Sequence, residues 1–346
     1  MTAQQSFLHE QHQSSLRGTM KVTLLGGGIG CSRLALPLAR RLGSELTVVV
    51  NSGDDHWRYG LRICPDLDTN IYALSGLQDR ERGWGVAGDT FRAMDRLAMF
   101  GEDPWFNLGD LDLAMHLSRT AALAAGSTLT EFAAEITKRL GIDATILPMT
   151  DQEVETRITT PTGEHSFEEY FVRDAALEPI EGVRYRGIVD AVTTPHVIEA
   201  IVEADLVLLG PSNPMSSIGP ILALPGVRDA VAASACIAVT PVISGVSIVD
   251  EGEERRARSR AAQLESIGLS HNATSVASLY ADLADIFVLD GADKKQIAAI
   301  KALGLNVATA PTILADDHTA DDLASLICDL GVRLTSTQRI PQRSRT

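Results

Sequence analysis

The chain has 346 residues, of which 45% are hydrophobic, and its formal net charge at pH 7 is −15. This length and composition are typical of a soluble globular protein with one large domain or two smaller ones. The negative charge argues against a general nucleic-acid binder, and no apolar run reaches the length of a membrane span. The cysteines form no C-x-x-C pair, so neither a disulfide framework nor a zinc site is expected, and a cytoplasmic location is predicted.

The first half of the chain predicts a strand, a helix and a second strand, followed by a helical region. Residues 1–19 are polar and aperiodic and are predicted to be a disordered N-terminal extension. KVTLLGGGIGCSRLALPLARRLG predicts a strand at 21–25, a glycine turn and a helix that ends near Gly43, and ELTVVVN predicts the next strand. Three helical segments follow, AGDTFRAMDRLAMFG, DLDLAMHLSRTAALAAG and STLTEFAAEITKRLG, and the third has capping-box spacing between Thr128 and Glu131.

The second half returns to an alternation of strands and helices after a predicted hairpin. VETRITTPTGEHSFEEYFV alternates in polarity on both sides of Pro161 and Gly163, which predicts the hairpin. Beyond it, strands are expected at 206–209, 236–239, 286–289 and 307–310, and helices at 195–203, 218–224, 275–282, 294–303 and 321–329. Single strands separated by helices predict an α/β fold with a Rossmann-like, mainly parallel sheet and helices on both faces.

The predicted organisation has one core and one insertion. Residues 20–74 and 191–330 are expected to form the nucleotide-binding core, 75–190 a helical and hairpin insertion, and 331–346 a C-terminal tail. In parallel sheets of this kind, ligands bind beyond the carboxyl ends of the strands. The motifs that directly follow predicted strands are therefore the candidates for a site.

An acidic segment follows the second predicted strand. VVVNSGDDHWRYGLRICPDLDTNIY contains four aspartates, Asp54, Asp55, Asp66 and Asp68. Gly53, Gly60 and Pro65 stand among them, so a loop is expected here rather than a helix. An acidic segment of this kind is usually a solvated surface loop without a binding role. In a chain with this net charge, however, a phosphate-bearing ligand needs compensation from backbone N–H groups, arginines or a metal ion.

Two further motifs predict anion binding. GGGIG follows the first strand, and its glycines let backbone N–H groups approach an anion at a helix N-terminus, although a purely structural turn is the alternative. Arg33 stands where a dinucleotide fingerprint needs glycine, and Asn51 where it needs an acid, so a nicotinamide oxidoreductase is disfavoured. LVLLGPSNPMSSIGP places polar side chains after an apolar strand, which predicts a second anion or base pocket. The alternative is an ordinary cap, with Ser217 capping a helix from Ile218.

Taken together, these motifs closely resemble the 2-phospholactate transferase family of coenzyme F-420 biosynthesis. The resemblance runs from Met20 to about Asp329 and rests on the glycine turn, NSGDD, PDLDT, GWG…GDTF, WFNLGDLDLAMHLSRT, ILPMTD and GPSNPMSSIGPIL, in this order. It implies a Mg²⁺ requirement and a homodimer. The reaction it implies is the transfer of a phosphoenolpyruvyl, phospholactyl or phosphoglyceryl moiety from a guanosine diphosphate-linked donor to the deazaflavin Fo, with release of GMP.

The resemblance also implies roles for individual residues. Asp55 and Asp68 match the positions expected to be catalytic and to hold the metal, with Asp66 and Asp54 as neighbouring ligands. The nucleotide phosphates are expected to contact Gly27, Gly28, Gly30, Gly210, Ser212, Asn213 and Ser217. The Fo pocket is expected to be bordered by Asn51, Trp84, Asp89, Asp110 and Arg119. From the residues alone, the two acids near helix starts, Asp89 and Asp110, are equally typical of N-caps, and the tryptophan of a core anchor.

Two departures from the family pattern concern the anionic end of the donor. Leu111 stands where family members commonly have arginine, and the segment 249–260, VDEGEERRARSR, replaces a GPA.K loop. The second hypothesis for function is a non-catalytic sugar-nucleotide-binding regulator, from a related family with the same fold. The expected partners are small molecules, with neither nucleic acid nor membrane among them.

Overall fold

The structure, a computed structural model, describes residues 20–245 and 250–338. The predicted extension over 1–19 therefore lies outside the described residues. The core is a seven-stranded sheet in the order β12-β11-β10-β9-β1-β2-β5, and all of its neighbouring strands are parallel. The strands are β1 (Val22–Gly26), β2 (Leu46–Val50), β5 (Thr145–Pro148), β9 (Leu206–Leu209), β10 (Cys236–Val239), β11 (Ile286–Leu289) and β12 (Asn306–Thr309). The predicted α/β fold is confirmed.

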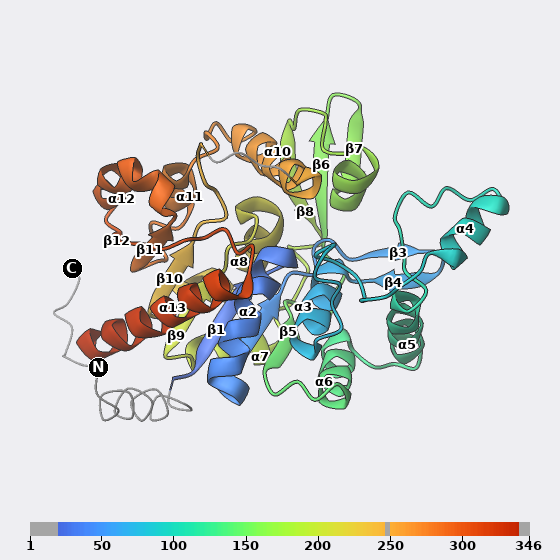
Figure 1. The fold of residues 1–346 in the computed structure, drawn as a ribbon, viewed down its shortest axis with the longest axis horizontal. Coiled ribbons are helices and arrows are strands. Elements are labelled where there is room, and N and C mark those ends of the chain that lie inside the picture. Colours follow the sequence, from blue (N-terminus) through green and yellow to red (C-terminus); the bar gives the residue numbers. More distant parts are fainter. Residues whose placement is uncertain (1–19, 246–249, 339–346) are drawn as a thin grey trace.

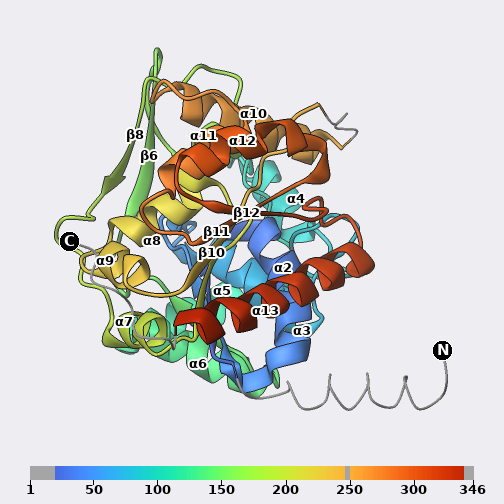
Figure 2. The same ribbon diagram turned by 90° about the vertical axis from the view of Figure 1, so that its left-hand side faces the viewer.

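Helices cover both faces of this sheet (Figures 1 and 2). Successive strand residues point to opposite faces, so Leu24 and Val48 join one hydrophobic cluster and Leu25 and Val49 the other. The first cluster is closed by α2 (Gly28–Leu42), α3 (Pro65–Ser75), α6 (Leu129–Arg139) and α13 (Asp317–Gln338). The second is closed by α7 (Pro195–Val202), α8 (Gly219–Ala223), α9 (Val227–Ala232), α11 (Ala273–Leu279) and α12 (Ile297–Ala302). The remaining short helical turns are η1 (Gly43–Glu45) and η4 (Gly291–Gln296).

Between β2 and β9 the chain builds two projections from the core (Figure 1). One contains the hairpin of β3 (His56–Arg58) and β4 (Leu61–Ile63), together with α4 (Arg92–Met99) and α5 (Asp112–Ala124). The other is a three-stranded sheet of β7 (Gly163–Ser166), β6 (Glu155–Thr160) and β8 (Gly182–Arg186), with the helical turn η2 (Glu169–Arg173). The predicted hairpin is β6–β7, and the predicted capping box is present at the start of α6.

Three features differ from the sequence-based expectation. β5 lies within 75–190, the predicted insertion, yet it pairs with β2 in the central sheet. The last helix continues to Gln338, beyond the predicted start of the tail at 331. The segment 249–260 was expected to be a loop, but Glu251–Glu265 form helix α10, because the Asp250 carboxylate accepts from Glu253 N at 2.8 Å and acidic residues occupy the first turn. Within the described ranges, no helix is both long and apolar enough to cross a membrane.

Candidate functional site

The carboxyl ends of the parallel strands β1 and β9 lie side by side at the centre of the sheet. From β1 the chain adds strands on one side of the sheet, and from β9 it adds them on the other. Such a switch point leaves a crevice in which α/β proteins bind ligands. A cavity of about 480 Å³ opens there. Its walls combine the glycine turn, the acidic segment, the loop after β9, aromatic residues of both projections and one side of α10.

Asn51, at the end of β2, organises the acidic segment. Its Nδ2 donates to Asp54 Oδ2 at 3.0 Å and to Asp66 Oδ2 at 2.9 Å, and its Oδ1 accepts from Gly53 N at 2.8 Å. The side chains of Asn51, Asp54 and Asp66 are buried, although Asp54 and Asp66 still line the cavity. One neutral amide therefore holds two carboxylates together without neutralising either.

Asp66 and Asp68 do not lie on a loop, as the sequence suggested, but in the first turn of α3. Pro65 occupies the first helical position, where its missing N–H costs nothing, and acids are favourable at the positive end of the helix dipole. The helix therefore begins inside the acidic run instead of after it. Asp66 contacts Asn51, Asp68 contacts Arg119, and both acids line the cavity.

The carboxylates of Asp54, Asp66 and Glu168 form a buried acidic cluster. Burial and the Asp66 charge raise the pKa of Asp54 well above its usual range. Burial raises the pKa of Asp66 to about 7, against the lowering effect of the Asn51 hydrogen bond. Burial and repulsion from Asp66 raise the pKa of Glu168 to about 8. Asp54 Oδ1 is buried and has no hydrogen-bond partner among the described residues. A cation would relieve this cluster.

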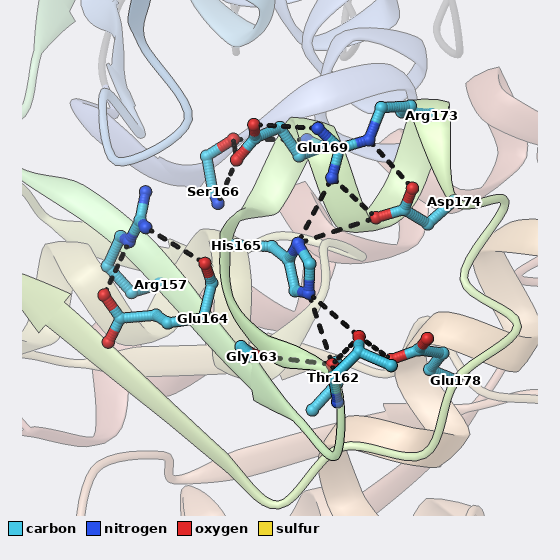
Figure 3. A network of polar contacts seen from close by, with 11 residues as sticks. Arg157, Thr162, Gly163, Glu164, His165, Ser166, Glu169, Arg173, Asp174 and Glu178 are labelled. Atoms are coloured by element: carbon cyan, nitrogen blue, oxygen red, sulfur yellow. Dashed lines mark hydrogen bonds and ion pairs between the residues drawn. The ribbon is translucent and has the colours of Figure 1, made fainter.

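Glu168 directly precedes η2 in the second projection, where a polar network joins the β6–β7 hairpin to η2 (Figure 3). Glu169 accepts from Ser166 N at 2.8 Å and from Arg173 Nη1 at 3.0 Å. Arg173 also contacts His165 Nδ1 at 3.2 Å and donates to Asp174 Oδ2 at 3.0 Å. The network fixes η2 on the β6–β7 hairpin, so the residues just before and within η2 face the cavity, namely Phe167, Glu168, Phe171 and Val172.

Asp68 differs from the other acids because its charge is balanced. Arg119 Nη1 and Nη2 donate to its two carboxylate oxygens at 2.6 and 2.9 Å, and Arg119 is fully buried. Asp68, Asp112 and His116 also each offer one atom within 4.8 Å of the others, so this group could hold a metal ion. The His116 Nδ1 lies 2.7 Å from Arg119 Nη2, which places a permanent cation beside that group. Coulomb repulsion from Arg119 opposes the binding of a cation at this group.

Asp55 lies behind the cavity wall. It is buried, does not line the cavity, and its Oδ2 is 3.4 Å from Arg62 Nη2. Burial raises its pKa to about 6, against the lowering effect of Arg62. Its Oδ1 has no hydrogen-bond partner within the described chain. The structure therefore brings Asp54, Asp66 and Asp68 to the cavity and leaves Asp55 behind its wall, and it places Asp68 and Asp55 each beside an arginine.

The glycine turn and the loop after β9 contact each other directly. Ser212 Oγ donates to Gly27 O at 2.9 Å and accepts from Gly27 N at 3.1 Å. A Cβ on Gly27 would lie 2.0 Å from Asp66 Oδ2, and one on Gly30 would lie 2.1 Å from Pro211 O. The anion that the turn approaches in this structure is thus the Asp66 carboxylate. Gly27, Gly28 and Gly30 line the cavity, whereas Gly210 does not.

The helical turn after β9 is capped by Asn213, and not by Ser217 as in the alternative interpretation of this motif. Asn213 Oδ1 accepts from Met215 N at 2.9 Å and from Ser216 N at 3.3 Å, which starts the helical turn η3 (Pro214–Ile218). Ser217 lies inside that turn. The Asn213 side chain stands two and three residues before these free N–H groups and can reach them, whereas the Ser217 hydroxyl lies inside the turn and cannot. Ser212, Asn213, Ser216 and Ser217 all line the cavity.

The residues expected to border the Fo pocket are divided between two places. Trp84 lines the cavity, and Asn51 and Arg119 support it from behind. Asp89 and Asp110 do not line it. Asp89 accepts from Leu111 N at 2.7 Å and Asp112 N at 3.0 Å at the start of α5, and Asp110 accepts from Ala93 N at 2.9 Å at the start of α4. These contacts agree with the capping alternative. Asp89, which precedes α4, caps α5, and Asp110, which precedes α5, caps α4.

Sequence reasoning missed several cavity residues. Glu168 and the phenylalanines beside it were treated only as hairpin sequence, and Trp105 and Phe106 line the cavity together with Trp84. The arginines of α10 were regarded as part of a loop, although Asp250 and Glu253 have the D-x-x-E spacing of a capping box. That spacing was the available signal for a helix here. Leu111 is exposed and does not line the cavity, so its departure from the family pattern does not change the cavity wall.

Comparison with known proteins places this chain among transferases. The family described as 2-phospho-L-lactate transferase CofD matches residues 22–307. The chain is 36% identical to a 2-phospho-L-lactate transferase of Methanosarcina barkeri over 308 residues, which cover 89% of this chain and 97% of that protein. It is 38% identical to phosphoenolpyruvate transferases of Thermobifida fusca and Mycolicibacterium smegmatis, with 91% of this chain covered and 99% and 100% of those proteins.

A solved structure shares the fold at much lower identity. A protein of the UPF0052 family from Bacillus halodurans superposes with a TM-score of 0.60 and 17% sequence identity, covering 90% of this chain and 99% of that one. This likeness concerns the arrangement of strands and helices alone.

Proposed function

We propose a specific reaction for this chain, which belongs to the 2-phospho-L-lactate transferase (CofD) family and is a phosphoenolpyruvate or 2-phospholactate transferase of coenzyme F-420 biosynthesis. In the proposed reaction, the terminal hydroxyl of Fo attacks the phosphorus that bears the carboxylate moiety of a guanosine diphosphate-linked donor. A new O–P bond forms, the P–O bond to the guanosine monophosphate breaks, and GMP leaves. The observation that carries the proposal is one cavity that combines a carboxylate cluster, an aromatic wall and a polar loop.

The acidic cluster fits Mg²⁺. Asp54 and Asp66 present hard carboxylate oxygens at the cavity, and Asp54 Oδ1 lacks a partner among the described residues. The pKa values of both acids are raised, first by burial and then by neighbouring carboxylates. Asp54 and Asp66 would hold the ion, while Asp68 and Asp55, each beside an arginine, would shape the surrounding field. A bound Mg²⁺ would neutralise negative charge on the phosphates of the donor.

The remaining cavity residues bind and orient the two substrates in the proposal. The aromatic side chains of Trp84, Trp105, Phe106 and Phe167 offer an apolar wall suited to the planar deazaflavin ring. Arg119 holds Asp68 in a single orientation and also donates to Arg62 O at 3.0 Å, so it connects α5 to the β3–β4 hairpin beside that wall. Asp89 and Asp110 act on the Fo pocket only through the helix starts that they cap.

The loop after β9 is the proposed site for the guanosine phosphates. Its hydroxyl groups, Ser212, Ser216 and Ser217, and the Asn213 amide line the cavity next to the glycine turn. Ser216 Oγ is buried and has no hydrogen-bond partner among the described residues, so a donor remains for a phosphate oxygen. This arrangement supports the roles expected for Gly27, Gly28 and Gly30, with the ligand reaching the turn beside Asp66.

The decisive experiment is incubation of the full chain with Fo, a guanosine diphosphate-linked donor and Mg²⁺, followed by mass analysis of the deazaflavin. The expected product is Fo enlarged by the phosphorylated carboxylate moiety, together with GMP. Asp54→Asn is the matched control, because the amide keeps size and one acceptor but removes a carboxylate. Guanosine nucleotide binding without Fo binding or turnover would contradict the proposal and favour the non-catalytic regulator. The expected homodimer stays a prediction that light scattering after size-exclusion chromatography will check.

A further inference from the structure

Helix α10 forms one wall of the cavity and is rich in arginine. Gly252, Arg255, Arg256, Ser259 and Arg260 line the cavity from this helix. The helix packs against η3, the turn that follows the polar loop after β9. Arg258 points to the other side, where it donates to Ala175 O and Ala176 O and ties α10 to the second projection. Figure 1 shows α10 lying alongside β6 and β7 at the top of the molecule.

Arg260 is partly buried, and one of its donor atoms is buried without a hydrogen-bond partner. Its Nε is buried and has no hydrogen-bond partner, and no carboxylate lies within ion-pair distance of it among the described residues. Arg256 is only partly compensated: its Nη2 donates to Glu253 at 2.9 Å, and its Nε is also buried without a partner. Buried donors without acceptors cost free energy, so such a pair is retained where a ligand supplies the acceptors.

The charged residues of α10 that line the cavity are all arginines, although the chain is strongly negative overall. Glu253 is shared by Arg256 at 2.9 Å and Arg33 at 3.7 Å, and Asp250 is 3.8 Å from Arg256. Burial lowers the pKa of Arg260 to about 10, the nearby Glu253 charge opposes this lowering, and Arg256 adds to it, so the guanidinium still carries its charge at neutral pH. Arg255 adds another cation to the same wall, and its partner Glu251 is 3.6 Å away and exposed.

We infer that Arg260 and Arg256, with the Ser259 hydroxyl, form an oxyanion subsite that binds a phosphate or carboxylate of the donor. The two guanidinium groups offer planar, charged N–H donors that match either oxyanion. The identity of the ligand as a guanosine diphosphate-linked donor rests on the proposed function, whereas the subsite itself rests on the unpartnered donors in the cavity wall. The subsite lies on the segment 249–260, which the resemblance marked as a departure from the family pattern.

The test compares Arg260→Met with Arg258→Met, a control on the same helix that does not line the cavity. Binding of GMP, GDP and the complete donor is measured by calorimetry in Mg²⁺. Arg260→Met should weaken at least one ligand tenfold or more, as expected when a charged hydrogen-bond donor is removed. A loss that begins at GDP assigns the subsite to the terminal phosphate, and a loss confined to the donor assigns it to the carboxylate. Equal affinities in wild type and variant for all three ligands overturn the inference.

A second measurement separates a binding role from a structural one. Without ligand, Arg260→Met should keep or raise the melting temperature, because a partly buried guanidinium whose Nε has no acceptor is replaced by an apolar side chain. Inorganic pyrophosphate should then raise the melting temperature of the wild type more than that of the variant. If wild type shows this difference but no transfer to Fo, the proposed function fails and the oxyanion subsite stands. If wild type transfers to Fo and Arg260→Met matches it in ligand binding and in pyrophosphate response, the subsite alone fails.

Discussion

Replacement of Asp68 and of Asp54 by asparagine should have opposite effects on stability, although both are buried acids of one acidic segment. Asp68 accepts two hydrogen bonds from the fully buried Arg119, at 2.6 and 2.9 Å. Asp68→Asn leaves that guanidinium without a counter-charge. Asp54 instead repels Asp66 and Glu168, so Asp54→Asn removes a repulsion while the amide oxygen can still accept from Asn51.

The magnitudes follow from these contacts. Breaking a buried ion pair by removing one partner costs about 3 to 5 kcal/mol, and the remaining amide oxygen places Asp68→Asn near the lower end, at roughly 3 kcal/mol. For a chain of this size, such a loss lowers the melting temperature by roughly 5 °C or more. Asp54→Asn should leave the melting temperature of the ligand-free protein unchanged or higher at about pH 8, where the cluster carries most charge.

The assay combines urea denaturation of ligand-free protein with turnover per folded molecule. Asp68→Asn should be destabilised, and Asp54→Asn should be stable but lose roughly a hundredfold or more in turnover, since it removes a proposed Mg²⁺ ligand. Asp68→Asn with wild-type stability would show that another acidic group balances the charge of Arg119. A destabilised Asp54→Asn would show that the acidic cluster is not under repulsion, and the argument for a cation there would fail.

Three further predictions concern metal, nucleotide and pH. Excess chelator should abolish turnover, and Mg²⁺ or Mn²⁺ but not monovalent salt should restore it; full turnover in chelator would remove the metal from the proposal. Asn213→Ala should weaken the binding of guanosine nucleotides more than the binding of Fo in calorimetry, because Asn213 starts the turn beside the glycine loop. Equal losses for both ligands would show that the loop after β9 is not the nucleotide site. Between about pH 6.5 and 8, ligand-free protein should lose stability as pH rises: unfolded carboxylates are already ionised, whereas folded Asp66 and Glu168, with pKa values of about 7 and about 8, still retain protons. Each retained proton contributes a slope of about 1.4 kcal/mol per pH unit, and urea denaturation showing flat or rising stability over this range would contradict the pKa shifts.

The fold was largely accessible from local sequence pattern. The predicted strands at 206–209, 236–239 and 286–289 coincide with β9, β10 and β11, because short apolar runs bounded by turns can be satisfied only in a buried parallel sheet. The order of motifs placed the glycine turn and the loop after β9 at strand ends, and hence at one edge of the sheet. β5 was missed because its four residues form a short run between α6 and the predicted hairpin and carry no alternation of polar and apolar side chains.

The roles of the individual acids were decided only by tertiary structure. Asp68 is neutralised by Arg119, which is 51 residues away, and Glu168 joins Asp66 from a separate projection. Hydrophobic periodicity indicates which face of an element is buried, but it carries no information about which distant side chain will lie opposite. The sequence by itself therefore determined the sheet, its motifs and the acidic character of the segment. Packing of remote elements determined which carboxylates share Asn51, which one is paired, and which arginines face the cavity without partners.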